Sequence, residues 1–134
     1  MTTVLIVEDN ERNMRLMRLL LRPLGYDLLE AVDGKEALAT LARTTPDIIL
    51  VDIQLPDVDG LEITRRLRRE PRFATTPIVA LTAYAMPGDR EMFLRAGCTG
   101  YVAKPIDTRA FPDIIASYLH GGVIPPTPDG MQPE

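Results

Sequence analysis

Three short runs of the chain are apolar throughout and rich in branched side chains, and they constrain the possible folds more than any other feature. They cover Val4–Val7, Ile48–Val51 and Ile78–Leu81. A run that is apolar on both faces suits a parallel strand covered by helices on either side, because neither face of such a strand meets water. The runs therefore predict a parallel sheet inside an α/β domain.

Helical patterns alternate with these runs. Apolar residues recur at helical spacing around residues 14–24, 38–42 and 111–118. Two weaker strands are expected over residues 26–31 and 100–103, each after a turn signal that contains glycine. Five strand-helix repeats with right-handed crossovers favour an open sheet, because the chain is too short for an eight-stranded barrel. We expect a (βα)5 flavodoxin-like three-layer sandwich with the parallel strand order 2-1-3-4-5.

The C-terminal part of the chain contains one local conflict and one change of composition. Pro112 would cost a backbone hydrogen bond if the last helix began near Thr108, so either the first turn is distorted or the helix begins late. After His120 the chain becomes rich in Pro and Gly, which favours extended, flexible conformations. We expect one domain over 1–120 and a flexible tail over 121–134, with no output domain.

Composition excludes several other classes of protein. The chain has 134 residues, of which 25% are charged, and its net charge is −4. No apolar run approaches the length of a membrane span, and the N-terminus lacks the features of a signal peptide, so we expect a cytoplasmic protein without membrane contact. The negative charge argues against DNA binding, which relies on clustered Lys and Arg. The arginines between positions 65 and 72 are expected to form the wet face of a helix.

The chain has a single cysteine, Cys98, and a single histidine, His120. One cysteine excludes an internal disulfide framework, and the two residues are too few for a zinc site. We expect Cys98 to be a small buried filler and His120 to be a solvated residue at a helix end.

Polar side chains follow the predicted strands at the edge where an open α/β sheet binds its ligands. They are Glu8, Asp9, Asp52, Thr82 and Lys104. Each alone has an ordinary explanation, such as a helix cap or a charge near a helix end. Together they place three carboxylates and one lysine at one edge, and close carboxylates repel one another unless a cation lies among them. Mg²⁺, which binds carboxylates, waters and phosphate oxygens, would relieve that repulsion.

A carboxylate can itself be the nucleophile in phosphoryl transfer, while a metal and a lysine neutralise the charge of the transferred group. Asp52 ends the central strand of the predicted sheet and is the natural candidate. The sequence therefore predicts a site for a metal ion and a phosphoryl group.

Five motifs in order and spacing resemble the defining motifs of the response-regulator receiver family, over about residues 3–120. They are Val7–Asn10, Val51–Pro56, Asp59-Gly60, Leu81–Ala83 and Lys104-Pro105. The stretches 52–60 and 82–89 are particularly similar to single-domain regulators of the DivK type and to the receiver domains of hybrid histidine kinases.

The resemblance implies a phosphoacceptor and a set of metal ligands. Asp52 would accept the phosphoryl group, and Asp9, Asp52 and the backbone carbonyl of Gln54 would bind Mg²⁺ directly, for which Mn²⁺ can substitute. Glu8 would hold a metal-bound water. Glu8 departs from the commoner aspartate of the family but keeps its charge.

The resemblance also implies residues that respond to the phosphoryl group. Lys104 and the Thr82 hydroxyl would contact phosphoryl oxygens, and Tyr101 would be the aromatic switch residue whose rotamer follows Thr82. Pro105 would follow a cis peptide bond. Ala83 and Gly60 would have structural roles beside the site, since they belong to the matched motifs.

The implied protein is a stand-alone two-component response regulator. A sensor histidine kinase or a histidine phosphotransfer protein would donate the phosphoryl group, and the surface of helix 4, strand 5 and helix 5 would then change its binding of a downstream protein. Such a protein is a phosphoacceptor switch, not an enzyme, and we expect a monomer or weak homodimer. Asn13, Met14 and Met17 lie in the helix after the acidic pair and could dock the partner, or the methionines could lie in the core.

Four other functions are less consistent with the sequence. A phosphatase or phosphomutase with an aspartyl nucleophile would have a second aspartate where this chain has Gln54. A flavin or dinucleotide carrier would have a glycine-rich loop in place of the acidic Glu8 and Asp9. A receiver-like module that is never phosphorylated would lack one of the key residues, and none is missing. DNA binding by the arginine run remains testable through its salt dependence.

Overall fold

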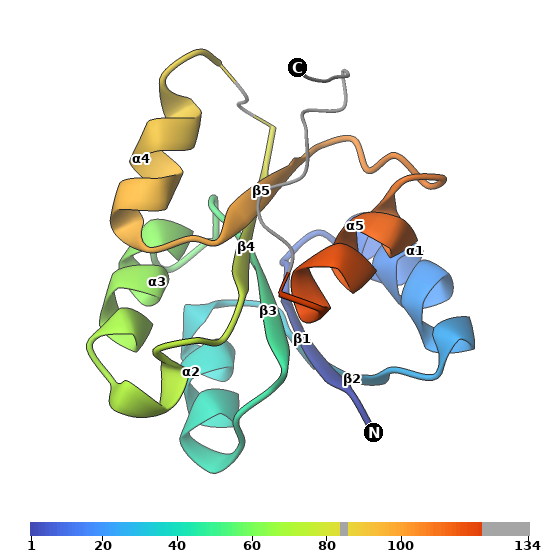
Figure 1. The fold of residues 1–134 in the computed structure, drawn as a ribbon, viewed down its shortest axis with the longest axis horizontal. Coiled ribbons are helices and arrows are strands. Elements are labelled where there is room, and N and C mark those ends of the chain that lie inside the picture. The colour runs from blue at the N-terminus through green and yellow to red at the C-terminus, as the bar shows by residue number, and fades with distance from the viewer. Residues whose placement is uncertain (84–85, 122–134) are drawn as a thin grey trace.

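A computed structural model describes residues 1–83 and 86–121, and in it five strands form one parallel sheet in the order β2-β1-β3-β4-β5 (Figure 1). This order confirms the predicted topology. The strands have the following bounds: β1 Thr3–Val7, β2 Asp27–Ala31, β3 Ile48–Asp52, β4 Ile78–Thr82 and β5 Gly100–Ala103.

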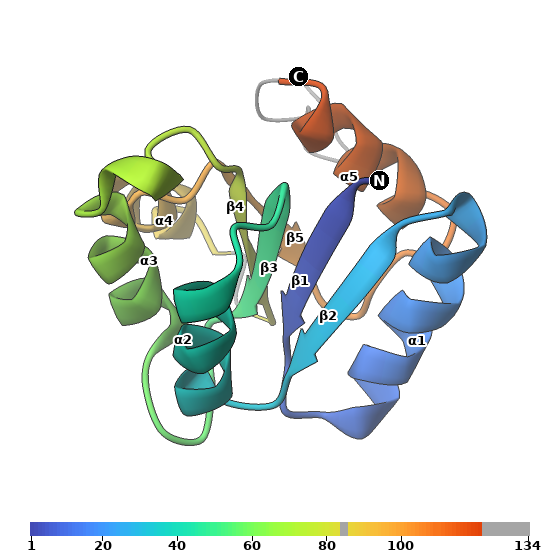
Figure 2. The same ribbon diagram turned by 90° about the horizontal axis from the view of Figure 1, so that it is seen from below.

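Helices cover both faces of the sheet. Helices α1 and α5 lie on one face, and α2, α3 and α4 lie on the other (Figures 1 and 2). The helices have the following bounds: α1 Glu11–Leu21, α2 Gly34–Arg43, α3 Gly60–Arg68, α4 Asp89–Ala96 and α5 Phe111–Leu119. Two short 3-10 segments, Arg22–Leu24 and Pro71–Phe73, follow α1 and α3. The arrangement is the predicted three-layer sandwich.

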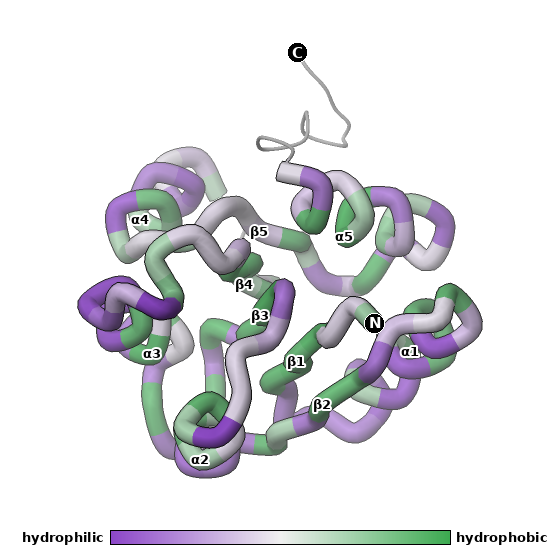
Figure 3. The backbone as a smooth tube through the Cα atoms, turned by 60° about the horizontal axis from the view of Figure 1, so that its bottom comes forward, coloured by the Kyte–Doolittle hydropathy of each residue, from purple (hydrophilic) through white to green (hydrophobic). Residues whose placement is uncertain are grey.

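The sheet supplies a core to both of its faces, which explains why its strands are apolar throughout. In β1, Val4 and Ile6 pack into the cluster formed with α1 and α5, whereas Leu5 and Val7 pack into the cluster formed with α2 and α3. All four side chains are fully buried. Figure 3 shows these apolar strands enclosed by helices of mixed polarity. Alternate side chains of one strand thus enter opposite cores.

Helix α5 begins late, which resolves the conflict over Pro112. The helix starts at Phe111, so Pro112 lies in its first turn, where a backbone N–H has no partner within the helix. The predicted tail over 121–134 lies outside the described residues apart from Gly121. Among the residues that the structure describes, no helix is both long and apolar enough to cross a membrane.

The arginine run is only partly a solvent-exposed helix face, which corrects the sequence prediction. Arg65 and Arg66 are exposed on α3, but Arg68 is half-buried and Arg72 lies in the 3-10 segment after the helix. The Arg68 guanidinium donates hydrogen bonds to backbone carbonyls of three residues, at 2.8 Å for Gly97, 2.6 Å for Phe73 and 2.8 Å for Thr76. It joins the end of α3 to the segments that lead into β4 and β5.

Cys98 is buried, as predicted for a filler residue. Burial raises the pKa of its thiol to about 11, so the thiol stays protonated and unreactive near neutral pH. His120 is exposed and follows the last residue of α5.

Candidate functional site

The carboxyl end of β1 delivers two acidic residues to the edge of the sheet. The strand ends at Val7, and the backbone N–H of Glu8 still donates to the carbonyl of Ala31 at 3.0 Å. Helix α1 then begins after Asn10, whose side chain caps it by accepting from the N–H of Asn13 at 3.0 Å. The tight strand-to-helix connection holds Glu8 and Asp9 between β1 and α1.

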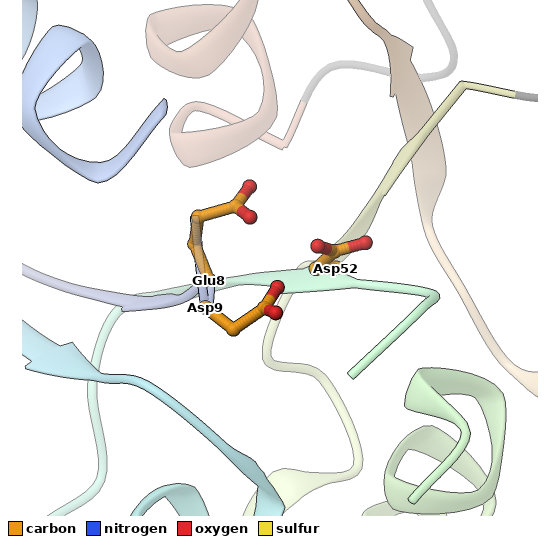
Figure 4. Close-up of side chains that lie close together, drawn as sticks. All are labelled: Glu8, Asp9 and Asp52. Atoms are coloured by element: carbon orange, nitrogen blue, oxygen red, sulfur yellow. The ribbon is translucent and has the colours of Figure 1, made fainter. Parts of the chain in front are cut away.

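Three carboxylates meet between the ends of β1 and β3. Glu8, Asp9 and Asp52 each offer an oxygen atom, and these atoms lie within 4.8 Å of one another (Figure 4). Glu8 is 1% exposed and Asp52 is 4% exposed, whereas Asp9 is exposed at the mouth of the site. Two of the three acids are therefore largely removed from water. Repulsion between negative charges is stronger in this buried environment than in water.

Lys104 supplies the positive charge among these carboxylates. Its Nζ atom donates a hydrogen bond to Oδ2 of Asp52 at 2.9 Å and lies 2.9 Å from Oε1 of Glu8 as an ion pair. The backbone N–H of Lys104 donates to the carbonyl of Thr82 at 2.7 Å, which fixes the chain as it leaves β5. The peptide bond between Lys104 and Pro105 is cis, as the resemblance implies.

The pKa values of the site reflect burial and mutual charge. Burial raises the pKa of Glu8 to about 7, Lys104 lowers it, and the neighbouring Asp52 raises it further. Burial lowers the pKa of the Lys104 ammonium, but its hydrogen bonds and charge attraction to Glu8 and Asp52 outweigh burial and raise the pKa overall. The site thus gathers three carboxyl groups around one lysine, and burial together with the neighbouring Asp52 makes the ionised form of Glu8 costly.

These residues fit a hard divalent cation. Their donor set consists of carboxylate oxygens, which Mg²⁺ prefers. In addition, Oε1 of Glu8 is buried, and the Lys104 ammonium 2.9 Å away takes at most one of the two lone pairs of this oxygen. A buried carboxylate oxygen with an open acceptor direction can bind a metal-bound water.

The loop after β3 is held tightly against Asp52. Oδ1 of Asp52 accepts a hydrogen bond from the N–H of Gln54 at 2.9 Å, and the N–H of Gly60 donates to the carbonyl of Ile53 at 2.9 Å. A Cβ atom at Gly60 would lie 2.2 Å from the carbonyl oxygen of Asp52, so no larger residue fits there. Asp59 caps α3 by accepting from the N–H of Leu61 at 2.8 Å. Gly60 is therefore a structural requirement of this turn.

Residues on β4 and β5 link the site to helix α4. Thr82 is buried at the end of β4, pairs with Ala103 of β5 and is followed by the exposed Ala83. Tyr101 of β5 is partly buried, and its ring centroid lies 5.7 Å from that of Phe93 in α4. This tilted aromatic pair joins β5 to α4, a contact that sequence reasoning missed because Phe93 has no local signal beyond its apolar character.

The structure decides the open question about docking residues. Met14 is 2% exposed and Met17 is fully buried, and both belong to the core between α1, α5 and the sheet. The proposal that these two methionines dock a partner is therefore wrong, because a docking side chain needs a free surface. Asn13 is partly exposed in the first turn of α1.

Sequence reasoning also missed Asp57, whose carboxylate contacts the first turn of α2. Asp57 accepts hydrogen bonds from the backbone N–H groups of Gly34 at 2.8 Å and Lys35 at 3.0 Å. More than twenty residues separate the partners in the chain, so no local pattern indicates the contact.

Comparisons with known proteins agree on one family. Residues 4–116 match the model of the response regulator receiver domain. A polar-differentiation response regulator DivK of Brucella anthropi is 45% identical over 117 residues, which cover 87% of this chain and 95% of the relative. DivK of Brucella ovis is similar to the same extent.

Solved structures show the same fold. The receiver domain of a sensor histidine kinase from Pseudomonas aeruginosa, with a magnesium ion coordinated in its active-site cleft, is 38% identical with a TM-score of 0.80. The match covers 89% of this chain and 98% of that one. The chemotaxis response regulator CheY4 of Vibrio cholerae is 28% identical with a TM-score of 0.82, and the match covers 87% and 97% of the two chains.

Proposed function

The chain belongs to the response-regulator receiver family, and from that premise we propose that Asp52 accepts a phosphoryl group from a phosphohistidine of a partner protein in the presence of Mg²⁺. The observation that carries the proposal is the surroundings of Asp52. This buried carboxylate at the end of the central strand lies beside two further carboxylates and receives a hydrogen bond from Lys104 at 2.9 Å.

The transfer balances as a displacement at phosphorus. An oxygen of the Asp52 carboxylate forms a bond to phosphorus, and the phosphorus–nitrogen bond of the phosphohistidine breaks. The other ring nitrogen of the phosphohistidine carries a proton, so the histidine leaves as neutral imidazole. Bound Mg²⁺ supplies positive charge that stabilises the transferring group. Asp9, Asp52 and the carbonyl of Gln54 are the proposed direct ligands, and Glu8 acts through a water; Mn²⁺ can take the place of Mg²⁺.

Lys104 and Thr82 respond to the new charge on Asp52. The Lys104 ammonium already contacts Asp52, so it can contact phosphoryl oxygens with a small movement. The Thr82 hydroxyl, buried at the end of β4, provides a second donor. Charge-assisted hydrogen bonds contribute about 1.5–3 kcal/mol each, and each 1.4 kcal/mol or so changes a two-state ratio about tenfold. Two such contacts suffice to reverse a modest preference for the inactive state.

The output of the switch is a change in protein binding. Tyr101 packs against Phe93, so a movement of Thr82 that draws Tyr101 inward alters the surface of α4, β5 and α5. We assign the phosphodonor to a sensor histidine kinase or histidine phosphotransfer protein and the output to a downstream protein. The only chemistry of the chain is then its own phosphorylation and dephosphorylation, which makes it a phosphoacceptor switch.

Labelling with acetyl phosphate tests this proposal. With Mg²⁺ the wild-type protein should gain one phosphoryl mass by intact mass spectrometry, and excess EDTA should abolish the gain. Asp52→Asn should show no gain, whereas the control Asp27→Asn, an exposed aspartate at the opposite end of the sheet, should be labelled like wild type. Full labelling of Asp52→Asn would contradict the assignment.

A further inference from the structure

Helix α2 begins against a carboxylate from another part of the chain. Its first two N–H groups, from Gly34 and Lys35, donate to the two carboxylate oxygens of Asp57 in the loop between β3 and α3, at 2.8 Å and 3.0 Å. The next N–H group, from Glu36, donates to the side chain of Asp33 at 2.8 Å. Two aspartates thus share one helix N-terminus, where backbone N–H groups otherwise lack partners.

The contact between this loop and α2 is close as well as polar. A Cβ atom at Gly34 would lie 2.2 Å from Cγ1 of Val58 and 3.2 Å from Oδ1 of Asp57. Although Asp57 is exposed, the hydrogen bonds from Gly34 and Lys35 hold the pKa of its carboxyl below its usual value, against a desolvation effect that raises it. If the loop moved away from α2, the packing of Val58 against Gly34 and the two hydrogen bonds to Asp57 would be lost.

The same loop carries Gln54, whose carbonyl is a proposed metal ligand. At the start of this loop, the N–H of Gln54 donates a hydrogen bond to the side chain of Asp52. Gln54 also forms an isolated antiparallel bridge with Asp59, near the end of the loop. On the far side, α2 follows β2, whose last residue, Ala31, accepts the N–H of Glu8. Glu8 is thus connected to Asp52 through a continuous series of contacts: from Glu8 to the end of β2, along the chain to the start of α2, and through Asp57 to the loop that carries Gln54.

We propose that Asp57 is a positioning residue for the metal and phosphoryl site. Its carboxylate binds the start of α2 and so fixes the loop that places the Gln54 carbonyl relative to Asp9 and Asp52. The inference rests on the proposed function, because it concerns the same metal. Asp57 touches neither metal nor phosphoryl group in this arrangement; it acts through the backbone of the loop.

A purely structural role for Asp57, as a helix cap, predicts a different result, and Asp33 provides the matched control. Asp57→Ala and Asp33→Ala both remove acceptors from the start of α2, and both should lower the melting temperature. Only Asp57→Ala releases the loop. Isothermal titration calorimetry with Mg²⁺ alone should therefore show about tenfold weaker binding for Asp57→Ala and wild-type affinity for Asp33→Ala. Loss of a residue that orients metal ligands typically weakens metal binding about 10- to 100-fold, and we expect the lower value here.

Two further variants guard against simple misfolding. Asp57→Asn keeps one carbonyl acceptor and should recover part of the Mg²⁺ affinity. Gly34→Ala keeps Asp57 but pushes Val58 away, and should weaken Mg²⁺ binding although alanine is the better helix former. Equal Mg²⁺ affinity in wild type and Asp57→Ala, or an equal loss in Asp57→Ala and Asp33→Ala, would overturn the proposal.

The same experiment separates this inference from the proposed function. Wild-type protein that binds Mg²⁺ and is labelled by acetyl phosphate upholds the function, whatever Asp57→Ala does. Wild-type protein that binds no Mg²⁺ overturns both.

Discussion

Glu8 should make the metal-free protein less stable as the pH rises towards neutral. Burial raises the pKa of Glu8 from an ordinary 4.5 to about 7, so the folded state holds this proton more tightly than the unfolded state. Stability from this group is fully present below about pH 4.5 and is lost as the pH rises through about 7. The difference in pKa corresponds to about 3 kcal/mol of unfolding free energy.

Other groups with shifted pKa values titrate outside this interval. The pKa values of Glu30 and Asp57 are lowered, so the stability they contribute is lost only as the pH falls below their usual values of 4.5 and 3.8. The pKa of Lys104 is raised above 10.5, so its contribution is lost only in strong alkali. Between about pH 5 and pH 8, the change in stability should therefore report mainly on Glu8.

Urea denaturation in EDTA across this pH range is the assay. Glu8→Gln keeps the size of the side chain and an acceptor for the N–H of Asn10, but it cannot titrate. Its stability should be nearly constant with pH and should exceed that of wild type at the alkaline end by up to about 3 kcal/mol. Glu91→Gln, which removes an exposed carboxylate on α4, should keep the wild-type slope.

Addition of Mg²⁺ completes the test. A cation that binds only the folded protein adds about 2.7 kcal/mol at a hundredfold excess over its dissociation constant. Mg²⁺ should therefore restore most of the lost stability of wild type at about pH 8, where Glu8 is ionised, and less at about pH 5. Parallel pH profiles for wild type and Glu8→Gln in EDTA would refute the reasoning.

Three further predictions concern the switch and the scaffold. Lys104→Met should reduce the phosphorylation-dependent change in partner binding about ten- to a hundredfold, the value of one charge-assisted contact, and Thr82→Ala should abolish the response of the Tyr101 ring to beryllofluoride by NMR. An equal Tyr101 response in wild type and Thr82→Ala would contradict this coupling. Arg68→Met leaves three backbone carbonyls without their donor and should lower the unfolding free energy, measured by urea denaturation, by about 3 kcal/mol. The control Arg65→Met should change it little, and equal stability of the two variants would contradict the structural role of Arg68.

The local sequence determined where the strands of the sheet lie and which polar residues stand at their carboxyl ends. A strand buried on both faces must be apolar at every position, so the runs at 4–7, 48–51 and 78–81 were recognisable without any tertiary information. The carboxyl ends of parallel strands lie at one edge, so Glu8, Asp9 and Asp52 could be placed together from their positions alone, and the structure brings their oxygens within 4.8 Å. The roles of these residues in metal binding and phosphoryl transfer stay proposals.

Only the tertiary structure decided how individual side chains are used. Met14 and Met17 fit either a core or a docking face, because helical spacing does not say which side of α1 meets the sheet. Arg68 looks like its exposed neighbours in the sequence, yet it binds carbonyls that other segments bring to it. Asp57 looks like an ordinary turn residue until α2 packs beside it. In each case the partner is distant along the chain, and packing of separate elements, not local sequence pattern, determines which groups meet.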